Sequence, residues 1–211
     1  MSEIYVVIGP PRSGTTLCAG ILHKCGIPMF PSTDKAVYGN AGDEWNPGGH
    51  FADSDFHNLT SQFLTGLDLP LPQWTPDQSA LSVITALVAE RSTVPKWGFK
   101  GLHAWIGAKV LAGLSHDVRI IRTSRPVDQS QASFTERTGE LFKDGAPSFV
   151  AAVKALSDAF YDDFTGPKMT VDFASIYDAT QATVDSIAAF AGVTPSTESV
   201  AFVNPDWRRF G

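Results

Sequence analysis

The sequence predicts a three-layer α/β fold, in which a mostly parallel β-sheet carries helices on both faces. Two observations lead to this prediction. Short runs rich in Val, Ile and aromatic residues alternate along the chain with longer segments of helical periodicity, which is the order that builds βαβ units. The first apolar run also passes through a glycine-rich loop into a helical segment. The chain has 211 residues, 43% of them hydrophobic, enough for one full core, so we predict a single domain over residues 1–211.

The expected strands are short and rich in Val, Ile or aromatic side chains, which favour strands. They are Ile4–Ile8, Trp97–Lys100, Val118–Arg122 and Met169–Phe173. The expected helices have apolar residues at helical spacing. They are Thr15–Cys25, Asp53–Leu64, Asp77–Arg91, Ala104–Leu114, Pro126–Thr138, Pro147–Phe164 and Ala179–Ala191. Because ligands bind at the carboxyl ends of parallel strands, Gly9, Lys100 and Arg125 are expected to meet at one edge of the sheet.

Residues 28–76 interrupt this alternation and are rich in Gly and Pro. Loops on a rigid scaffold often carry binding residues, so we expect this insert to form the acceptor site. The alternative is a loop that packs its own aromatic side chains. Its aromatic residues include Tyr38, Trp45, Phe51, Phe56, Phe63 and Trp74.

The loop after the first strand has nearly the P-loop pattern G-x-x-x-x-G-K-[ST]. Gly9 and Gly14 have the required spacing and Thr16 supplies the hydroxyl, but Thr15 stands where the lysine belongs. A basic residue, Arg12, lies three positions earlier. The backbone N–H groups of residues 12–16 can surround an anion at a helix N-terminus. The sequence therefore predicts a P-loop NTPase-like fold whose loop binds phosphate without having to be an ATPase. The alternative is a strand-to-helix turn without a ligand.

The stretch Pro11–Leu17 resembles the 5′-phosphosulfate-binding loop of the sulfotransferases that use 3′-phosphoadenosine 5′-phosphosulfate (PAPS). This resemblance implies that PAPS is the sulfuryl donor and that the loop binds its 5′-phosphosulfate. The binding residues would be Arg12, Ser13, Gly14, Thr15 and Thr16. A sulfuryl group carries less charge than a γ-phosphoryl group, so no metal is expected.

A second motif strengthens the resemblance. The family carries an Arg at a strand end and a Ser eight positions later, both on the 3′-phosphate, and Arg125 and Ser133 have that spacing. Arg suits the role because its planar guanidinium binds phosphate through charge-assisted hydrogen bonds. Gln129, Ser130, Ser133 and Arg137 are expected to form one polar stripe on the following helix. Weaker similarities to microbial members lie at 46–53, 97–100, 171–173 and 191–193.

Sulfuryl transfer, like phosphoryl transfer, is an in-line displacement helped by positioning and charge stabilisation. Arg12 and Lys100 are the expected cations at the leaving group. His103 is the first choice for the general base, because an ordinary His pKa suits that role at neutral pH. Asp53 and His50 are the alternatives, since the acidic position of the family motif holds Ala52 here. The expected acceptor is a hydroxyl or amine of a small molecule or carbohydrate.

Two other functions stay open on the sequence. One is a P-loop kinase for a small molecule, although the strand at 118–122 ends in Arg122 rather than in the carboxylate that holds Mg²⁺. Asp172, at another strand end, keeps this hypothesis open. The other is a non-catalytic nucleotide-binding protein, which the Ala at position 52 favours.

Composition and charge exclude several further classes. The formal net charge of −6 argues against nucleic-acid binding, and basic residues gather instead near the expected site, at Arg12, Lys100, Arg122 and Arg125. The chain has no long apolar run and opens on a strand, so we expect a cytoplasmic protein without a membrane partner.

Cys18 and Cys25 lie about two helical turns apart, too far for a disulfide. His50, His57, Asp53 and Asp55 match no metal template. Arg208 and Arg209 are expected to cap a terminal helix, or else to reach a phosphate. The sequence leaves the oligomeric state open.

Overall fold

The computed structural model describes residues 2–30, 51, 55–56, 78–138 and 146–210. Within these ranges, five strands form one sheet in the order β2-β3-β1-β4-β5, and every pair of neighbouring strands is parallel. The strands are β1 (Glu3–Ile8), β2 (Met29–Phe30), β3 (Lys96–Lys100), β4 (Asp117–Ser124) and β5 (Lys168–Asp172).

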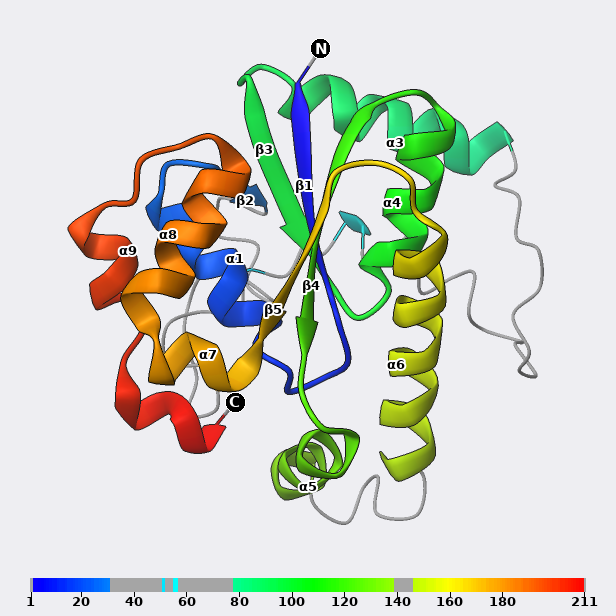
Figure 1. Ribbon diagram of the computed structural model, residues 1–211. Coiled ribbons are helices and arrows are strands. Elements are labelled where there is room, and N and C mark those ends of the chain that lie inside the picture. Colours follow the sequence, from blue (N-terminus) through cyan, green and yellow to red (C-terminus); the bar gives the residue numbers. More distant parts are fainter. Residues whose placement is uncertain (1, 31–50, 52–54, 57–77, 139–145, 211) are drawn as a thin grey trace.

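Helices cover both faces of this sheet (Figure 1). One face carries α1 (Thr15–Lys24), α7 (Phe173–Asp178), α8 (Thr180–Ala191) and α9 (Thr197–Ala201). The other carries α3 (Gln78–Arg91), α4 (Ala104–Gly113) and α6 (Ala146–Asp163). Helix α5 (Val127–Thr138) follows the carboxyl end of β4, and a 3₁₀ helix, η2 (Pro205–Phe210), follows α9. The predicted three-layer α/β fold is therefore confirmed.

The central strand β1 explains why two cores form. Successive side chains of a strand point to opposite faces. Ile4, Val6 and Ile8 belong to the cluster under α3, α4 and α6. Tyr5 and Val7 belong to the cluster under α1, α7 and α8. All five side chains are buried, so β1 fixes the start of the loop that follows it between two packed layers.

The four predicted strands are all present, within two residues at each end. Phe173 was predicted to end the last strand, but it is the first residue of α7. Three further elements, β2, α7 and α9, were not predicted from the sequence. Of the helix expected at 53–64, Asp55 and Phe56 are described and helical. The rest of that helix, and most of the insert at 28–76, lie outside the described residues.

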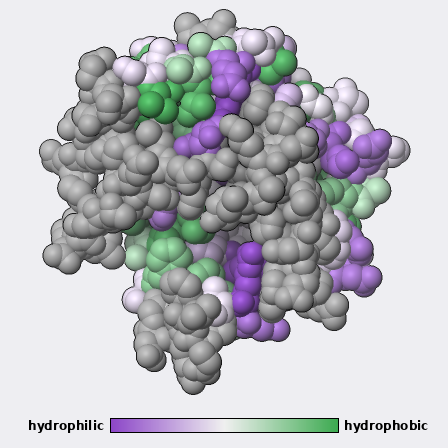
Figure 2. All heavy atoms as spheres, turned by 180° about the vertical axis from the view of Figure 1, so that it is seen from behind, coloured by the Kyte–Doolittle hydropathy of each residue, from purple (hydrophilic) through white to green (hydrophobic). Residues whose placement is uncertain are grey.

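Cys18 and Cys25 are both free thiols, as predicted. Burial raises the pKa of the Cys18 thiol to about 12. Seen from the side opposite to Figure 1, the described surface mixes hydrophilic and hydrophobic residues (Figure 2). In the part of the chain that the structure describes, none of the helices has both the length and the apolar character needed to cross a membrane.

Candidate functional site

The order of the strands brings the predicted phosphate-binding residues to one edge of the sheet. β1 lies between β3 and β4, with Val7 beside Lys100 and Ile8 beside Arg122. The loop at 9–14 leaves β1, Lys100 ends β3, and Arg125 follows β4. The expectation that these three strand ends meet is confirmed by the register.

The loop has a backbone that few sequences adopt. Gly9 has φ +149° and Gly14 has φ +94°. A Cβ on Gly9 would lie 2.3 Å from the Thr123 Oγ1, so neither the conformation nor the space allows a side chain there. Arg12 has φ +64°, a left-handed conformation that disfavours residues with a Cβ. Such conformations persist only where surrounding contacts hold them.

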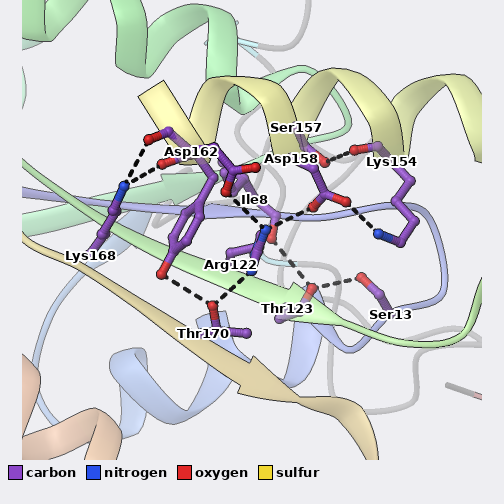
Figure 3. A network of polar contacts seen from close by, with 11 residues as sticks. Ile8, Ser13, Arg122, Thr123, Lys154, Ser157, Asp158, Asp162, Lys168 and Thr170 are labelled. Atoms are coloured by element: carbon purple, nitrogen blue, oxygen red, sulfur yellow. Dashed lines mark hydrogen bonds and ion pairs between the residues drawn. The ribbon is translucent and has the colours of Figure 1, made fainter. Parts of the chain in front are cut away.

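Two hydroxyls anchor the loop to β4 (Figure 3). The Ser13 hydroxyl donates to the carbonyl of Pro10 at 2.7 Å. It also shares a hydrogen bond with the Thr123 hydroxyl, with the oxygens 2.6 Å apart. Thr123 Oγ1 in turn lies 3.3 Å from the carbonyl oxygen of Ile8, so the single hydrogen of Thr123 is shared between this carbonyl and Ser13. Ser13 and Thr123 are both buried, so the side chain of Ser13 holds the loop in shape.

Arg12 is the centre of the site. Its side chain is buried, and its Nε donates to Ser133 Oγ at 3.2 Å. Its carbonyl oxygen accepts from Arg125 Nη1 at 2.8 Å. These two contacts bring together Arg12, Arg125 and Ser133, three of the predicted site residues. One contact fixes the side chain of Arg12 and the other fixes its carbonyl, so together they stabilise its left-handed backbone.

The polar stripe predicted for α5 divides into two parts. Ser130 and Ser133 are buried, whereas Gln129 is exposed. Ser133 turns toward the loop, where it receives Arg12.

Lys100 completes the cationic group. Its Nζ donates to Thr16 Oγ1 at 2.9 Å, so two further predicted residues lie together. Burial lowers the pKa of Lys100 to about 7, and the positive charges of Arg12 and Arg137 lower it as well. An anion entering this region would relieve the repulsion and favour the protonated amine.

The first turn of α1 offers backbone donors to the same region. Gly14 is the N-cap of α1 and Thr15 is its first residue; no described side chain caps this end, and the first turn holds no acidic residue. The first N–H groups of a helix lack partners within it, and the helix dipole favours an anion there. This helix start is therefore compatible with the predicted anion site, which is formed by backbone N–H groups.

The predicted general bases are less well defined. His103 immediately precedes α4 and is half-buried; its carbonyl accepts from the Ile106 N–H at 2.9 Å. Asp53 and His50 lie outside the described residues. The choice among the three stays a prediction.

Arg122 does not belong to the site, which corrects the sequence analysis. Its Nη1 donates to Asp158 at 3.1 Å, and its Nη2 donates to the Thr170 hydroxyl at 3.2 Å. Its guanidinium lies over the ring of Tyr161, 4.1 Å from the centroid. Strand side chains alternate between faces. The side chain of Arg122 contacts β5 and α6 (Figure 3).

A pocket of about 520 Å³ opens beside Arg125, between α5, α7 and η2. The guanidinium of Arg125 lies 4.2 Å from the centroid of the Phe173 ring, a cation–π contact. Sequence reasoning missed this wall because it assigned Phe173 to a strand. The pocket is lined by Arg125, Gln129, Phe173, Ala174, Pro205, Asp206 and Arg208.

Arg208 lines this pocket and pairs with a carboxylate. Its Nη1 donates to Asp178 at 2.7 Å, so it ties η2 to the end of α7. The side chain of Arg209 lies outside the described residues.

No protein-family model and no curated protein matches the chain, but solved structures do. The sulfotransferase domain of the Synechococcus PCC 7002 olefin synthase superposes with a TM-score of 0.54 at 17% identity, over 97% of this chain and 77% of that one. The sulfotransferase domain from the curacin biosynthetic pathway gives 0.56 at 15% identity, over 98% and 80%. A sugar kinase from Janibacter sp. HTCC2649 gives 0.49 at 13% identity, over 92% and 97%. The chain therefore has a sulfotransferase-like P-loop fold.

Proposed function

We propose that this protein is a PAPS-dependent sulfotransferase, which transfers a sulfuryl group to a hydroxyl or amine of a small-molecule or carbohydrate acceptor. The observation that carries the proposal is the arrangement around Arg12. A P-loop without the usual lysine has an arginine in its own turn, and that arginine is hydrogen-bonded to both Arg125 and Ser133. The family resemblance assigns Arg12 to the 5′-phosphosulfate of the donor. It assigns Arg125 and Ser133 to the 3′-phosphate.

The donor would lie across this group. The N–H groups of residues 12–16 and the start of α1 would hold the 5′-phosphosulfate. Arg125 would bind the 3′-phosphate, because a guanidinium forms charge-assisted hydrogen bonds to phosphate oxygens. Ser133, which accepts a hydrogen bond from Arg12, would either keep that contact or turn to the 3′-phosphate.

In the reaction, the acceptor oxygen or nitrogen would form a bond to sulfur while the bond from sulfur to the bridging oxygen breaks. Negative charge then grows on the leaving 5′-phosphate. Arg12 and a protonated Lys100 would offset this charge from a buried position, where such interactions are stronger than in water. His103, the first choice for the base, would take the proton of the acceptor.

The end of β4 supports a sulfuryl donor over Mg·ATP. P-loop phosphotransferases hold Mg²⁺ with a carboxylate at the end of a strand near the loop. β4 lies next to β1 and ends in Arg122, Thr123 and Ser124. The side chain that faces the loop is the hydroxyl of Thr123, a neutral group that suits a donor without a metal.

Calorimetric titration tests this proposal. Wild type, Arg125→Ala and Arg122→Ala would each be titrated with 3′-phosphoadenosine 5′-phosphate (PAP) without Mg²⁺, and with Mg·ATP. We expect PAP to bind, Arg125→Ala to weaken it by about tenfold or more, and Arg122→Ala to leave it unchanged. Arg122 is the matched control because it lies three residues away and pairs with Asp158. Tighter, Mg²⁺-dependent ATP binding that ignores Arg125 would refute the proposal.

A further inference from the structure

The hydroxyl of Tyr177 is a buried polar group to which the described residues supply no hydrogen-bond partner. This residue lies on α7, next to the pocket between α5, α7 and η2. Most buried polar groups in folded proteins are paired, and an exception calls for an explanation such as a missing ligand.

Tyr177 lies behind the lining of that pocket, in contact with residues that line it. Its ring packs edge-on against Phe173, with the centroids 5.5 Å apart, and Phe173 lines the pocket beneath Arg125. On the other side, the guanidinium of Arg208 lies 5.9 Å from the Tyr177 ring centroid. Tyr177 is therefore in contact with Arg208 and with Phe173, the ring over which Arg125 lies.

A second unused donor lies on the same side. The Nε of Arg125 is also buried without a hydrogen-bond partner among the described residues, although its Nη1 is bound to Arg12. The positive charges that act on Tyr177 come from Arg125, Arg12 and Arg208. Donors without partners in a positive field favour an anionic oxygen as the ligand atom.

The protonation state of Tyr177 agrees with a role as donor. Burial raises the pKa of its hydroxyl to about 12, against the opposing effect of the three arginines. The phenol therefore keeps its proton at neutral pH and offers an O–H to an acceptor.

We propose that the Tyr177 hydroxyl donates a hydrogen bond to a phosphate of the nucleotide held beside Arg125, and so helps the site to distinguish nucleotides that carry this phosphate. The inference rests on the proposed function, in which Arg125 binds the 3′-phosphate. Arg208 is the group that must yield, because it lies over the ring and its side chain is 53% exposed. Such an exposed ion pair is weak enough to move when a ligand enters.

The test compares Tyr177→Phe with wild type in calorimetric titrations with PAP and with adenosine 5′-phosphate, which lacks the 3′-phosphate. Tyr161→Phe is the control, because it removes a hydroxyl that bonds Thr170 away from the pocket. We expect Tyr177→Phe to weaken PAP binding by about tenfold, the usual effect of one hydrogen bond to a charged group. Binding of adenosine 5′-phosphate should stay the same, and Tyr161→Phe should bind both like wild type.

A melting curve without ligand adds an independent readout. A hydroxyl that serves only the fold would lower the Tm when removed. An unpaired buried hydroxyl opposes folding, so Tyr177→Phe should melt at the same temperature as wild type or higher. A lower Tm would contradict the inference.

The outcomes separate the two proposals. If wild type prefers PAP and Tyr177→Phe keeps that preference, the inference about Tyr177 is overturned while the proposed function stands. An equal loss for both nucleotides would also overturn it, because the hydroxyl would then not face the 3′-phosphate. If wild type binds PAP no better than adenosine 5′-phosphate, the proposed function itself is contradicted.

Discussion

Arg12 and Ser133 are joined by a hydrogen bond of 3.2 Å between residues that lie 121 positions apart in the sequence. The family resemblance pairs Ser133 with Arg125, and the structure instead gives its hydroxyl to the arginine of the loop. Arg125 reaches the same residue from its other side, through the carbonyl of Arg12. The three residues thus form one hydrogen-bonded group.

Ser133→Ala should weaken PAP binding by about three- to tenfold. The substitution frees the charged Nε of Arg12 from its fixed direction but keeps the cation, so we expect a loss of about 1 kcal/mol in binding, less than the value of a full hydrogen bond to a charged group. Titration calorimetry measures the change. Ser186→Ala is the control, because Ser186 is exposed on α8 and bonds only its own helix. An unchanged affinity in Ser133→Ala would show that this contact does not orient Arg12 for the ligand.

Anion binding should weaken as the pH rises from 7 to 9. Burial lowers the pKa of Lys100 to about 7, so most of the protein has a neutral amine above that pH. A bound anion favours the charged form, and binding then takes up a proton, with a limiting slope of about tenfold per pH unit. PAP titrations across this range measure the slope. Lys100→Met should bind more weakly with little pH dependence, and a flat profile in wild type would contradict the prediction.

The same shift predicts how Lys100 affects the free energy of unfolding. Folding lowers its pKa from 10.5 to about 7, so the unfolded chain binds more protons between these values. Lys100 therefore destabilises the fold most below pH 7, and this effect fades as the pH rises toward 10.5. Thermal melts should show a higher Tm for Lys100→Met at pH 6.5, with a smaller difference at pH 9.5. A difference that grows with pH would contradict this assignment.

Gly9→Ala should lower the free energy of unfolding by about 3 kcal/mol. The new Cβ meets Thr123 and Ser13 at 2.3 and 2.8 Å, and φ +149° strains any residue with a side chain. Urea denaturation followed by circular dichroism measures the loss. Gly101→Ala is the matched control, since its added Cβ has no described atom within 4 Å beyond its chain neighbours. If the two variants had equal free energies of unfolding, the close packing of Gly9 against Thr123 and Ser13 would be contradicted.

Arg122→Ala should reduce stability without changing nucleotide affinity. It removes hydrogen bonds to Asp158 and Thr170 and the contact with the Tyr161 ring. Because these groups are partly exposed, the expected loss is about 1–2 kcal/mol. Denaturation and PAP titration on the same preparation separate the two effects. A weaker PAP affinity would return Arg122 to the site.

The sequence predicted the elements with strong local signals. The strand β1, the loop and α1 follow from the apolar run and the spacing of Gly9 and Gly14. The two-residue strand β2 carries too little pattern, and it exists because Met29 pairs with Gly98 on β3. Such a tertiary pairing has no trace in local propensity.

Helices α7 and α9 did leave local signals. The side chain of Asp172 accepts from the Ser175 N–H as the N-cap of α7. Ser196 and Ser199 form a capping box at α9. Both are recognised helix starts, and they were overlooked because each helix is short. The part of the site that no local signal reveals is the partner of each side chain, such as Tyr177 beside two arginines from distant elements.

The site is bounded by a buried set of contacts around Arg12 and by an exposed contact around Arg208. The loop and the start of α5 are joined through both the side chain and the carbonyl of a single buried residue. The opposite wall, α7 and η2, is joined by the exposed pair of Arg208 and Asp178. Among these contacts, solvent screens the Arg208–Asp178 pair the most, whereas the hydrogen bond of the Arg12 side chain to Ser133 is buried.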